Sequence, residues 1–221
     1  MKFTRYGVYY VPGGGFGDRG AAWLGRDLRR GRAVAQPEGL AEITQAPRRY
    51  GFHATIKPPF RLAEGQGEAD LRAAFAAFCG AQKPVHLEGL QVAAMGRFLA
   101  LVPVGEVGPL NALAGATVEA LDPFRAPATQ DELERRRGRL TAAQEANLLR
   151  WGYPYVMEAF RFHLTLTDRL DGAARETAAA RAGAHFSADL AGDVEVHALS
   201  LVGEGDGGRF YEVMRCGFGA G

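Results

Sequence analysis

The chain has 221 residues, of which 47% are hydrophobic and 23% charged, as in ordinary globular proteins and unlike disordered or fibrous chains. Its formal charge of +1 excludes a global electrostatic attraction to nucleic acid or an anionic membrane, so phosphate binding would need a local group of cations. The sequence has no apolar run of membrane-spanning length and no apolar signal-peptide core at its start, so we expect a cytoplasmic protein. Its two cysteines, Cys79 and Cys216, have neither metal-ligand spacing nor the pattern of a disulfide framework.

The first half of the chain alternates strand, turn and helix signals. Short alternating apolar runs predict strands, and alanine-rich periodic segments predict helices. In order, we predict a strand over 4–11, a glycine-rich turn over 12–17, a helix over 20–30, a strand over 50–60, a helix over 68–79, and strands over 85–95 and 97–104. The turn lacks the Gly-Lys-Ser/Thr ending of a phosphate loop, so we interpret it as a mobile turn.

The second half repeats this order after a helical insertion. It predicts a helix over 108–121, a charged helical segment over 131–150, a strand over 160–170, a helix over 172–184, and strands over 194–203 and 208–217. Three landmark pairs keep nearly one spacing, which is 110 residues for His53 and His163, 111 for His86 and His197, and 112 for Arg97 and Arg209. We therefore predict an internal duplication in a single bilobal domain, with halves near 1–105 and 106–221 and an insertion near 122–159.

The pattern His-x-Thr occurs once in each half, on a predicted strand. His53 and Thr55 form the first motif, and His163 and Thr165 form the second, each with Phe before the His. Because side chains alternate along a strand, the His and Thr of each motif share one face. The apolar residues between them face the other way. Each strand is thus predicted to have one face for a core and one for chemistry.

Two imidazoles across a cleft suit displacement at phosphorus. One neutral His can take a proton from the attacking water, while the other, protonated, gives a proton to the departing oxygen. The threonine hydroxyls can donate hydrogen bonds to the non-bridging phosphate oxygens. This chemistry requires no metal and no other cofactor, and the sequence has no histidine pair with metal-ligand spacing.

Other side chains near the motifs are weaker candidates for the site. Lys57 and Arg161 lie on the predicted motif faces and can bind substrate, or they can be ordinary solvated side chains. Tyr155 precedes the second motif strand and can line the cleft or simply pack. For His86 and His197 we predict structural roles. The run 135–137 of three arginines is either a solvated helix face or part of a lid over an anionic substrate.

The two motifs resemble those of the two-histidine phosphoesterase superfamily, which includes RNA 2′,5′-ligase-like enzymes and cyclic nucleotide phosphodiesterases. The surrounding segments 49–60, RYGFHATIKPPF, and 151–155, WGYPY, before 160–163, FRFH, look like those of an uncharacterised family encoded among phosphonate-utilisation genes. This resemblance implies an α+β fold, bilobal and duplicated, with two antiparallel sheets facing a central cleft and helices outside. It also implies metal-independent hydrolysis of a cyclic phosphodiester by His53 and His163, with Thr55 and Thr165 binding phosphate.

The implied substrate is a small cyclic phosphate of a sugar or nucleotide, such as the phosphoribosyl 1,2-cyclic phosphate formed in phosphonate breakdown. One alternative is an RNA-end phosphoesterase acting on 2′,3′-cyclic or 2′,5′-linked ends. Another is a module that binds a phosphorylated ligand without turnover. We expect neither a membrane nor an obligate protein partner. The sequence leaves open which His is the acid, which ring bond opens, and the oligomeric state.

Overall fold

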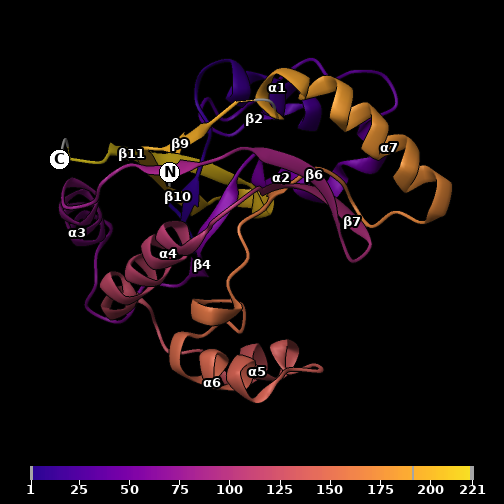
Figure 1. Ribbon diagram of the computed structural model, residues 1–221. Coiled ribbons are helices and arrows are strands. Elements are labelled where there is room, and N and C mark those ends of the chain that lie inside the picture. The colour runs from indigo at the N-terminus through magenta and orange to yellow at the C-terminus, as the bar shows by residue number, and fades with distance from the viewer. Residues whose placement is uncertain (1, 191, 220–221) are drawn as a thin grey trace.

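The computed structural model describes residues 2–190 and 192–219, and its centre is a seven-stranded sheet in which all neighbouring strands are antiparallel (Figure 1). The strand order is β11-β10-β1-β4-β8-β7-β6. The strands are β1 (Tyr6–Tyr10), β4 (Ala54–Phe60), β6 (Leu90–Met95), β7 (Phe98–Pro103), β8 (Leu164–Thr165), β10 (Ala198–Glu204) and β11 (Phe210–Gly217). Two small antiparallel pairs join β2 (Arg26–Asp27) to β3 (Arg32–Ala33), and β5 (Val85–Leu87) to β9 (Val194–Val196).

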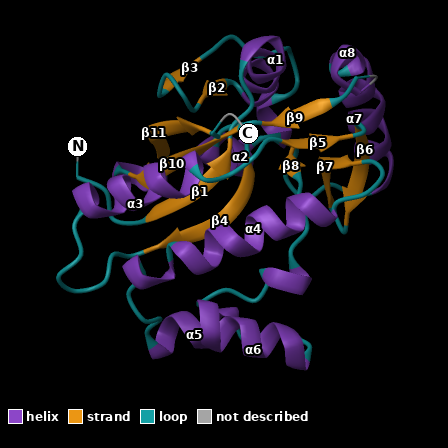
Figure 2. Cartoon of the chain, turned by 60° about the vertical axis from the view of Figure 1, so that its left-hand side comes forward, coloured by secondary structure: helices purple, strands orange, loops and turns teal. Residues whose placement is uncertain are grey.

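Helices surround this sheet, and the pair α5 and α6 forms a separate layer beyond α4 (Figure 2). The α-helices are α1 (Gly14–Leu24), α2 (Gln45–Tyr50), α3 (Glu68–Gly80), α4 (Gly108–Ala120), α5 (Gln130–Arg136), α6 (Ala142–Trp151), α7 (Gly172–His185) and α8 (Ser187–Leu190). The short 3-10 helices are η1 (Ala41–Ile43), η2 (Asp122–Phe124), η3 (Met157–Ala159) and η4 (Asp206–Gly208). Among the described residues, no helix combines the length and apolar character needed to cross a membrane.

The predicted α+β class with antiparallel sheets and outer helices is confirmed. The two motif strands, β4 and β8, pair with each other through Ala54 and Leu164, and this pair joins the two groups of strands into one sheet. Both side chains are fully buried in the main hydrophobic cluster, to which α1, α3, α4 and α7 also contribute. The motif strands therefore meet at the middle of the sheet, with one face held by the core.

The element order is repeated as the sequence predicted, but the hairpins of the two halves are exchanged in space. The series β4, α3, β5, β6, β7 recurs as β8, α7, β9, β10, β11, with α8 added after α7. Hairpin β6–β7 from the first half pairs with β8, whereas hairpin β10–β11 from the second half pairs with β1 beside β4. The two ends of the sheet thus each combine strands from both halves of the sequence. The division into two sequence halves stays a prediction.

The glycine-rich segment forms helix rather than the predicted turn. Helix α1 begins at Gly14 and ends at Gly25, whose left-handed backbone (φ 73°) caps it well before the predicted end at Arg30. The helix packs closely at Gly20, where a Cβ would lie 1.9 Å from the ring of Phe52. Glycine at this position lets α1 approach the residue that immediately precedes His53. The close packing depends on the tertiary structure, so turn-type composition was misleading here.

Two further predicted elements are shorter than expected. The segment over 131–150 is two helices, because Thr129 and Thr141 each form a capping box that starts a separate helix. The second motif strand has ladder pairing only over Leu164–Thr165, and the amides of Leu166 and Thr167 both donate to the Leu99 carbonyl instead. Chain segments before and after β8 are therefore extended without regular strand pairing.

We predict that Gly20→Ala destabilises the protein by about 1–3 kcal/mol, because the added methyl overpacks the contact with Phe52. Gly183→Ala, in α7, is the matched control, because no atom lies within 4 Å of the place that its added methyl would take. It should stabilise the protein by about 0.5–1 kcal/mol through helix propensity. Urea unfolding of the three proteins measures both changes. Equal stabilisation by the two substitutions would contradict the close approach of α1 to Phe52.

Candidate active site

The four motif side chains lie together on the face of the sheet opposite Ala54 and Leu164. Because Ala54 is paired with Leu164 in an antiparallel ladder, continuing the register sets His53 against Thr165 and Thr55 against His163. The four side chains form a square in which each His is diagonal to the other. The backbone positions of diagonal residues across an antiparallel pair are roughly 7–8 Å apart, and the charge of His163 acts on His53. The structure thus brings both predicted His-Thr pairs into one site.

Each imidazole is anchored by the backbone carbonyl two residues before it. His53 Nδ1 lies 2.8 Å from the Gly51 oxygen, and His163 Nδ1 lies 2.7 Å from the Arg161 oxygen. A carbonyl only accepts, so Nδ1 is the protonated nitrogen in both neutral rings. Nε2 is then the unprotonated nitrogen, and in His53 it lies 3.2 Å from the Thr55 hydroxyl oxygen. Both histidines therefore present Nε2 for proton transfer.

The carbonyl that holds His53 depends on glycine at position 51. Gly51 has φ 73° and ψ 178°, a combination that is essentially restricted to glycine. A Cβ here would also lie 2.6 Å from the Cβ of Leu28. The second repeat has Arg161 at the equivalent place, so the same carbonyl contact is made from an ordinary backbone. The two anchors are alike in function and different in construction.

Tyr9 is the main neighbour of His53 that the sequence pattern did not identify. The two rings are stacked, with centroids 3.8 Å apart and planes 21° apart. Tyr9 is almost fully buried and is paired with Thr55 in the ladder between β1 and β4. The sequence shows Tyr9 only as one residue of an apolar strand, and its neighbours Val8 and Tyr10 have the same character, so nothing in the sequence marks it as a site residue.

The pKa of His53 is lowered to about 4, mainly by burial and to a smaller extent by the imidazole of His163, while the hydrogen bond to the Gly51 carbonyl acts in the opposite direction. His53 is consequently neutral at pH 7. A neutral imidazole with a free Nε2 is a proton acceptor. On the neighbouring strand, the ring of His163 is tilted relative to that of Phe98, and the two ring centroids are 5.9 Å apart.

Lys57 is not where the sequence places it. A β-bulge between β1 and β4 interrupts the alternation after Thr55, and Lys57 pairs with the core residue Val8. Its side chain is 2% exposed, and Nζ donates to the Val118 carbonyl (2.9 Å) and lies 3.6 Å from an Asp122 oxygen. Burial lowers the pKa of Lys57 to about 8, against the opposing effect of Asp122. Lys57 thus contacts α4 and η2 rather than sharing the face of His53.

Arg161 and Tyr155 are both exposed near the second motif. The Arg161 guanidinium donates to the carbonyls of Glu158 (3.2 Å) and Phe160 (2.7 Å), and the residue lines a cavity with Phe160 and Phe162. Tyr155 is 50% exposed and lies edge-on to Tyr153, with ring centroids 5.8 Å apart. Their predicted contact with substrate stays a prediction.

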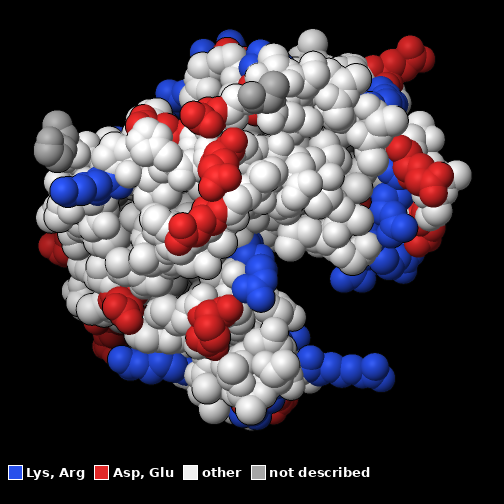
Figure 3. All heavy atoms as spheres, viewed as in Figure 1, with Lys and Arg blue, Asp and Glu red and all other residues white. Residues whose placement is uncertain are grey.

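The insertion places cations and aromatic rings against the end of β4, beyond the first motif. A deep notch separates the α5–α6 layer from the sheet, with basic side chains at its inner end (Figure 3). At this junction a cavity is lined by the five cations Arg5, Lys57, Arg61, Arg125 and Arg136, by Tyr153 and by one carboxylate, Glu132. The run 135–137 is therefore more than the solvated face considered from the sequence, because Arg136 lines this cavity.

His86 and His197 lie away from the motifs on the small β5–β9 pair. Both are exposed, and both contact Glu195, at 3.3 Å from His86 Nε2 and 3.5 Å from His197 Nδ1. Across residues 2–190 and 192–219, no group of three or more His, Cys, Asp or Glu side chains is arranged to hold a metal ion.

A family model described as "Protein of unknown function (DUF1045)" matches residues 55–211. Two curated relatives, both named ribose 1,5-bisphosphate phosphokinase PhnN, are 40% identical to this chain. The match to the protein of Janthinobacterium sp. (strain Marseille) covers 98% of this chain and 51% of that protein. The match to the protein of Laribacter hongkongensis (strain HLHK9) covers 96% of this chain and 51% of that protein. The chain spans about half the length of the curated relatives it matches.

The fold is also similar to that of several solved structures. A crystal structure titled as a phosphoesterase matches with a TM-score of 0.46 and 12% identity, over 99% of this chain and 100% of that one. LigT of E. coli in complex with NADP+ matches with a TM-score of 0.46 and 12% identity, over 100% of both chains.

We predict that His53 titrates near pH 4, well below an ordinary imidazole. Because the folded-state pKa is below that of the unfolded chain, near 6.5, folding stability is lost as the pH falls from 6.5 to 4. NMR titration of the imidazole nitrogens measures the pKa, and unfolding at several pH values measures the loss. His53→Gln should flatten this pH dependence, whereas the exposed-site control His86→Gln should keep it. A His53 titration near pH 6.5 would disprove the effect of burial.

Proposed function

The chain belongs to the DUF1045 family of proteins of unknown function, and we propose that it hydrolyses a cyclic phosphodiester by acid–base catalysis between His53 and His163. One observation carries the proposal: two imidazoles of the same tautomer, each anchored through Nδ1, lie diagonally across one pair of strands. Each has a threonine hydroxyl opposite it. This arrangement supplies a proton acceptor, a proton donor and two hydrogen-bond donors around one phosphoryl group.

His53 is the base in the proposed reaction. Its neutral Nε2 takes a proton from a water molecule as the water oxygen attacks phosphorus. The bond from phosphorus to one ring oxygen breaks, and His163, which enters the reaction as the doubly protonated imidazolium, donates its Nε2 proton to that oxygen. The product is a phosphate monoester with one new hydroxyl group, and the exchange of protons with solvent restores both rings. During the reaction the Gly51 carbonyl still accepts from Nδ1, which stabilises the imidazolium formed at His53.

Thr55 and Thr165 bind the non-bridging phosphate oxygens in this scheme. In the absence of substrate, the Thr55 hydroxyl is within hydrogen-bond distance of His53 Nε2, so the phosphate displaces an internal contact. The hydroxyls contribute to rate when their hydrogen bonds strengthen as charge develops in the transition state. Stacking of Tyr9 on His53 keeps the ring in its plane and limits its access to water.

The substrate we favour is a phosphoribosyl 1,2-cyclic phosphate, as formed in phosphonate breakdown. Support comes from the family resemblance of the motifs and from the curated relatives, which are named for an enzyme of phosphorylated ribose. Their kinase name is not extended to this chain, whose glycine-rich segment 13–17 has no Gly-Lys-Ser/Thr ending. We propose that the kinase activity of those proteins lies in the half that this chain does not span.

An RNA-end phosphoesterase is a second candidate because an exposed tyrosine, Tyr50, lies near the site. Tyr50 is 39% exposed, with its ring centroid 6.2 Å from that of His53, and Tyr155 is 50% exposed. Aromatic rings beside a phosphate site can stack on bases. A nucleoside 2′,3′-cyclic phosphate would use them, whereas a phosphoribosyl cyclic phosphate would not.

We predict that the protein opens phosphoribosyl 1,2-cyclic phosphate without a metal ion. Phosphorus NMR in excess chelator measures this reaction. His53→Ala and His163→Ala should each lower kcat/KM by roughly 10²–10⁴-fold, since each removes one proton-transfer group. Thr55→Val and Thr165→Val should cost less, about 10- to 100-fold. His86→Ala is the control and should change nothing.

Nucleoside 2′,3′-cyclic phosphates are assayed in parallel. Faster opening of these compounds would favour the RNA-end function over the sugar phosphate. If the folded wild-type protein opens no cyclic phosphate, hydrolysis is excluded for these substrates, and ligand binding without turnover becomes the better account. Full activity in either His variant would rule out the paired-histidine mechanism.

A further inference from the structure

We propose that the cavity beneath the α5–α6 layer is a second anion subsite, in which Arg136 binds a phosphate monoester carried by the same substrate whose cyclic phosphate lies between His53 and His163. This inference rests on the proposed function and extends it to the substrate class. The substrate would be a small molecule with two phosphoryl groups, one cyclic and one terminal.

The charges around the cavity are unequally balanced. Arg5 is paired with Glu204 (2.5 Å), Arg61 with Glu132 (3.0 Å), and both Lys57 and Arg125 with Asp122 (3.6 and 2.7 Å). Together with Arg136, five cations face three carboxylates, which leaves two positive charges. Among the described residues, Arg136 makes no ion pair with a carboxylate. A partly buried guanidinium without a carboxylate partner is suited to bind an anionic ligand.

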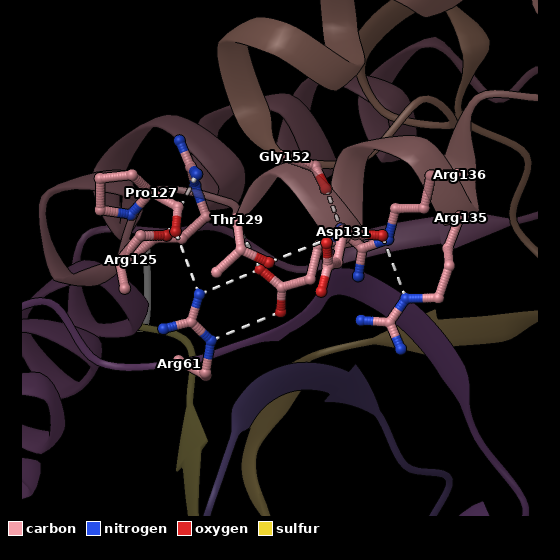
Figure 4. A network of polar contacts seen from close by, with 10 residues as sticks. Arg61, Arg125, Pro127, Thr129, Asp131, Arg135, Arg136 and Gly152 are labelled. Carbon is pink, nitrogen blue, oxygen red and sulfur yellow. Dashed lines mark hydrogen bonds and ion pairs between the residues drawn. The ribbon is translucent and has the colours of Figure 1, made fainter.

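The hydrogen-bond and cation–π contacts that hold Arg136 are with neutral groups. One of its nitrogens donates to the Gly152 carbonyl, and its guanidinium carbon lies 5.5 Å from the ring centroid of Tyr153. Figure 4 shows its side chain directed toward Gly152, while that of Arg135 turns away to the Asp131 carbonyl. Burial lowers the pKa of Arg136, Glu132 acts in the opposite direction without forming an ion pair, and the nearby Arg5 lowers the pKa further. An anion between these two guanidinium groups would offset both effects.

The cavity is close to the histidine site through Tyr9. The Tyr9 ring stacks on His53, and Arg5 precedes Tyr9 by four residues along a strand with unbroken register, so the two side chains share one face of the sheet. Arg5 and Tyr153 both line the cavity. We therefore place the ligand along this face, with its cyclic phosphate at the imidazoles and its monoester at the arginines.

Charge favours a monoester over a diester in this cavity. A cyclic phosphodiester carries one negative charge, and a phosphate monoester carries nearly two at pH 7. Two excess positive charges match the monoester, and a planar guanidinium can donate two parallel hydrogen bonds to it. The cyclic phosphate, with its single negative charge, then binds between the imidazoles and the threonine hydroxyls.

The test compares opening of 5-phosphoribosyl 1,2-cyclic phosphate with that of ribose 1,2-cyclic phosphate. The wild-type protein should prefer the 5-phosphorylated compound in kcat/KM, and Arg136→Gln should reduce the ratio of the two values roughly 10- to 100-fold. Arg136→Lys should restore part of the ratio. Arg135→Gln, a neighbour that contacts only the Asp131 carbonyl among the described hydrogen bonds, is the matched control and should leave the ratio unchanged. A wild-type protein that opens both compounds equally well would overturn the subsite and leave the proposed hydrolysis intact.

A binding measurement separates the subsite from catalysis. Ribose 5-phosphate, which has the monoester but no cyclic group, is titrated into the wild-type protein and the Arg136→Gln and Arg135→Gln variants by calorimetry. We expect binding to weaken at least about 10-fold in Arg136→Gln alone. This result would support the subsite even if no cyclic phosphate were hydrolysed. Absent binding to the wild-type protein, or equal binding to Arg136→Gln, would refute it.

Discussion

The pairing of Ala54 with Leu164 is the contact that positions every group of the site. It is the place where β4 and β8 meet, and it joins strands from both halves of the sequence into one sheet. Both side chains are buried in the core, so a slip of one residue would send apolar groups to the solvent face and the motif groups into the core. The burial of two small apolar residues thus sets where the His and Thr side chains lie.

Once the register is set, local backbone geometry decides the chemistry of each imidazole. The Gly51 and Arg161 carbonyls select the Nδ1-protonated tautomer in both rings, and Nε2 is left toward the site. The environments then differ, because His53 lies against the buried ring of Tyr9 while His163 lies beside Phe98 at a larger distance. A duplicated motif can thereby give two unequal groups, as proton transfer in opposite directions requires.

The insertion adds charged and aromatic side chains beside the sheet. Arg5, at the start of β1, is paired with Glu204, so its charge is already balanced without α5 and α6. The insertion adds Arg136 and Tyr153, held together by a cation–π contact and by the Gly152 carbonyl. In the proposed function the core would carry out the reaction and the insertion would give selectivity, a division that is common where loops surround a rigid scaffold.

Local patterns in the sequence were enough to predict the α+β class, the repeated element order, and the two His-x-Thr strands with their apolar inner faces. These features follow from periodicity, which a sequence displays directly. The folded chain alone revealed the exchange of hairpins between halves, the bulge that turns Lys57 toward Asp122, the stacking of Tyr9 on His53, and the approach of Arg136 to Arg5. Each of these arises from contacts between residues distant in the chain or from a break in alternation, and neither leaves a periodic signal. The glycine-rich start of α1 shows the same limit, because its composition is typical of a turn while its packing against Phe52 requires a helix.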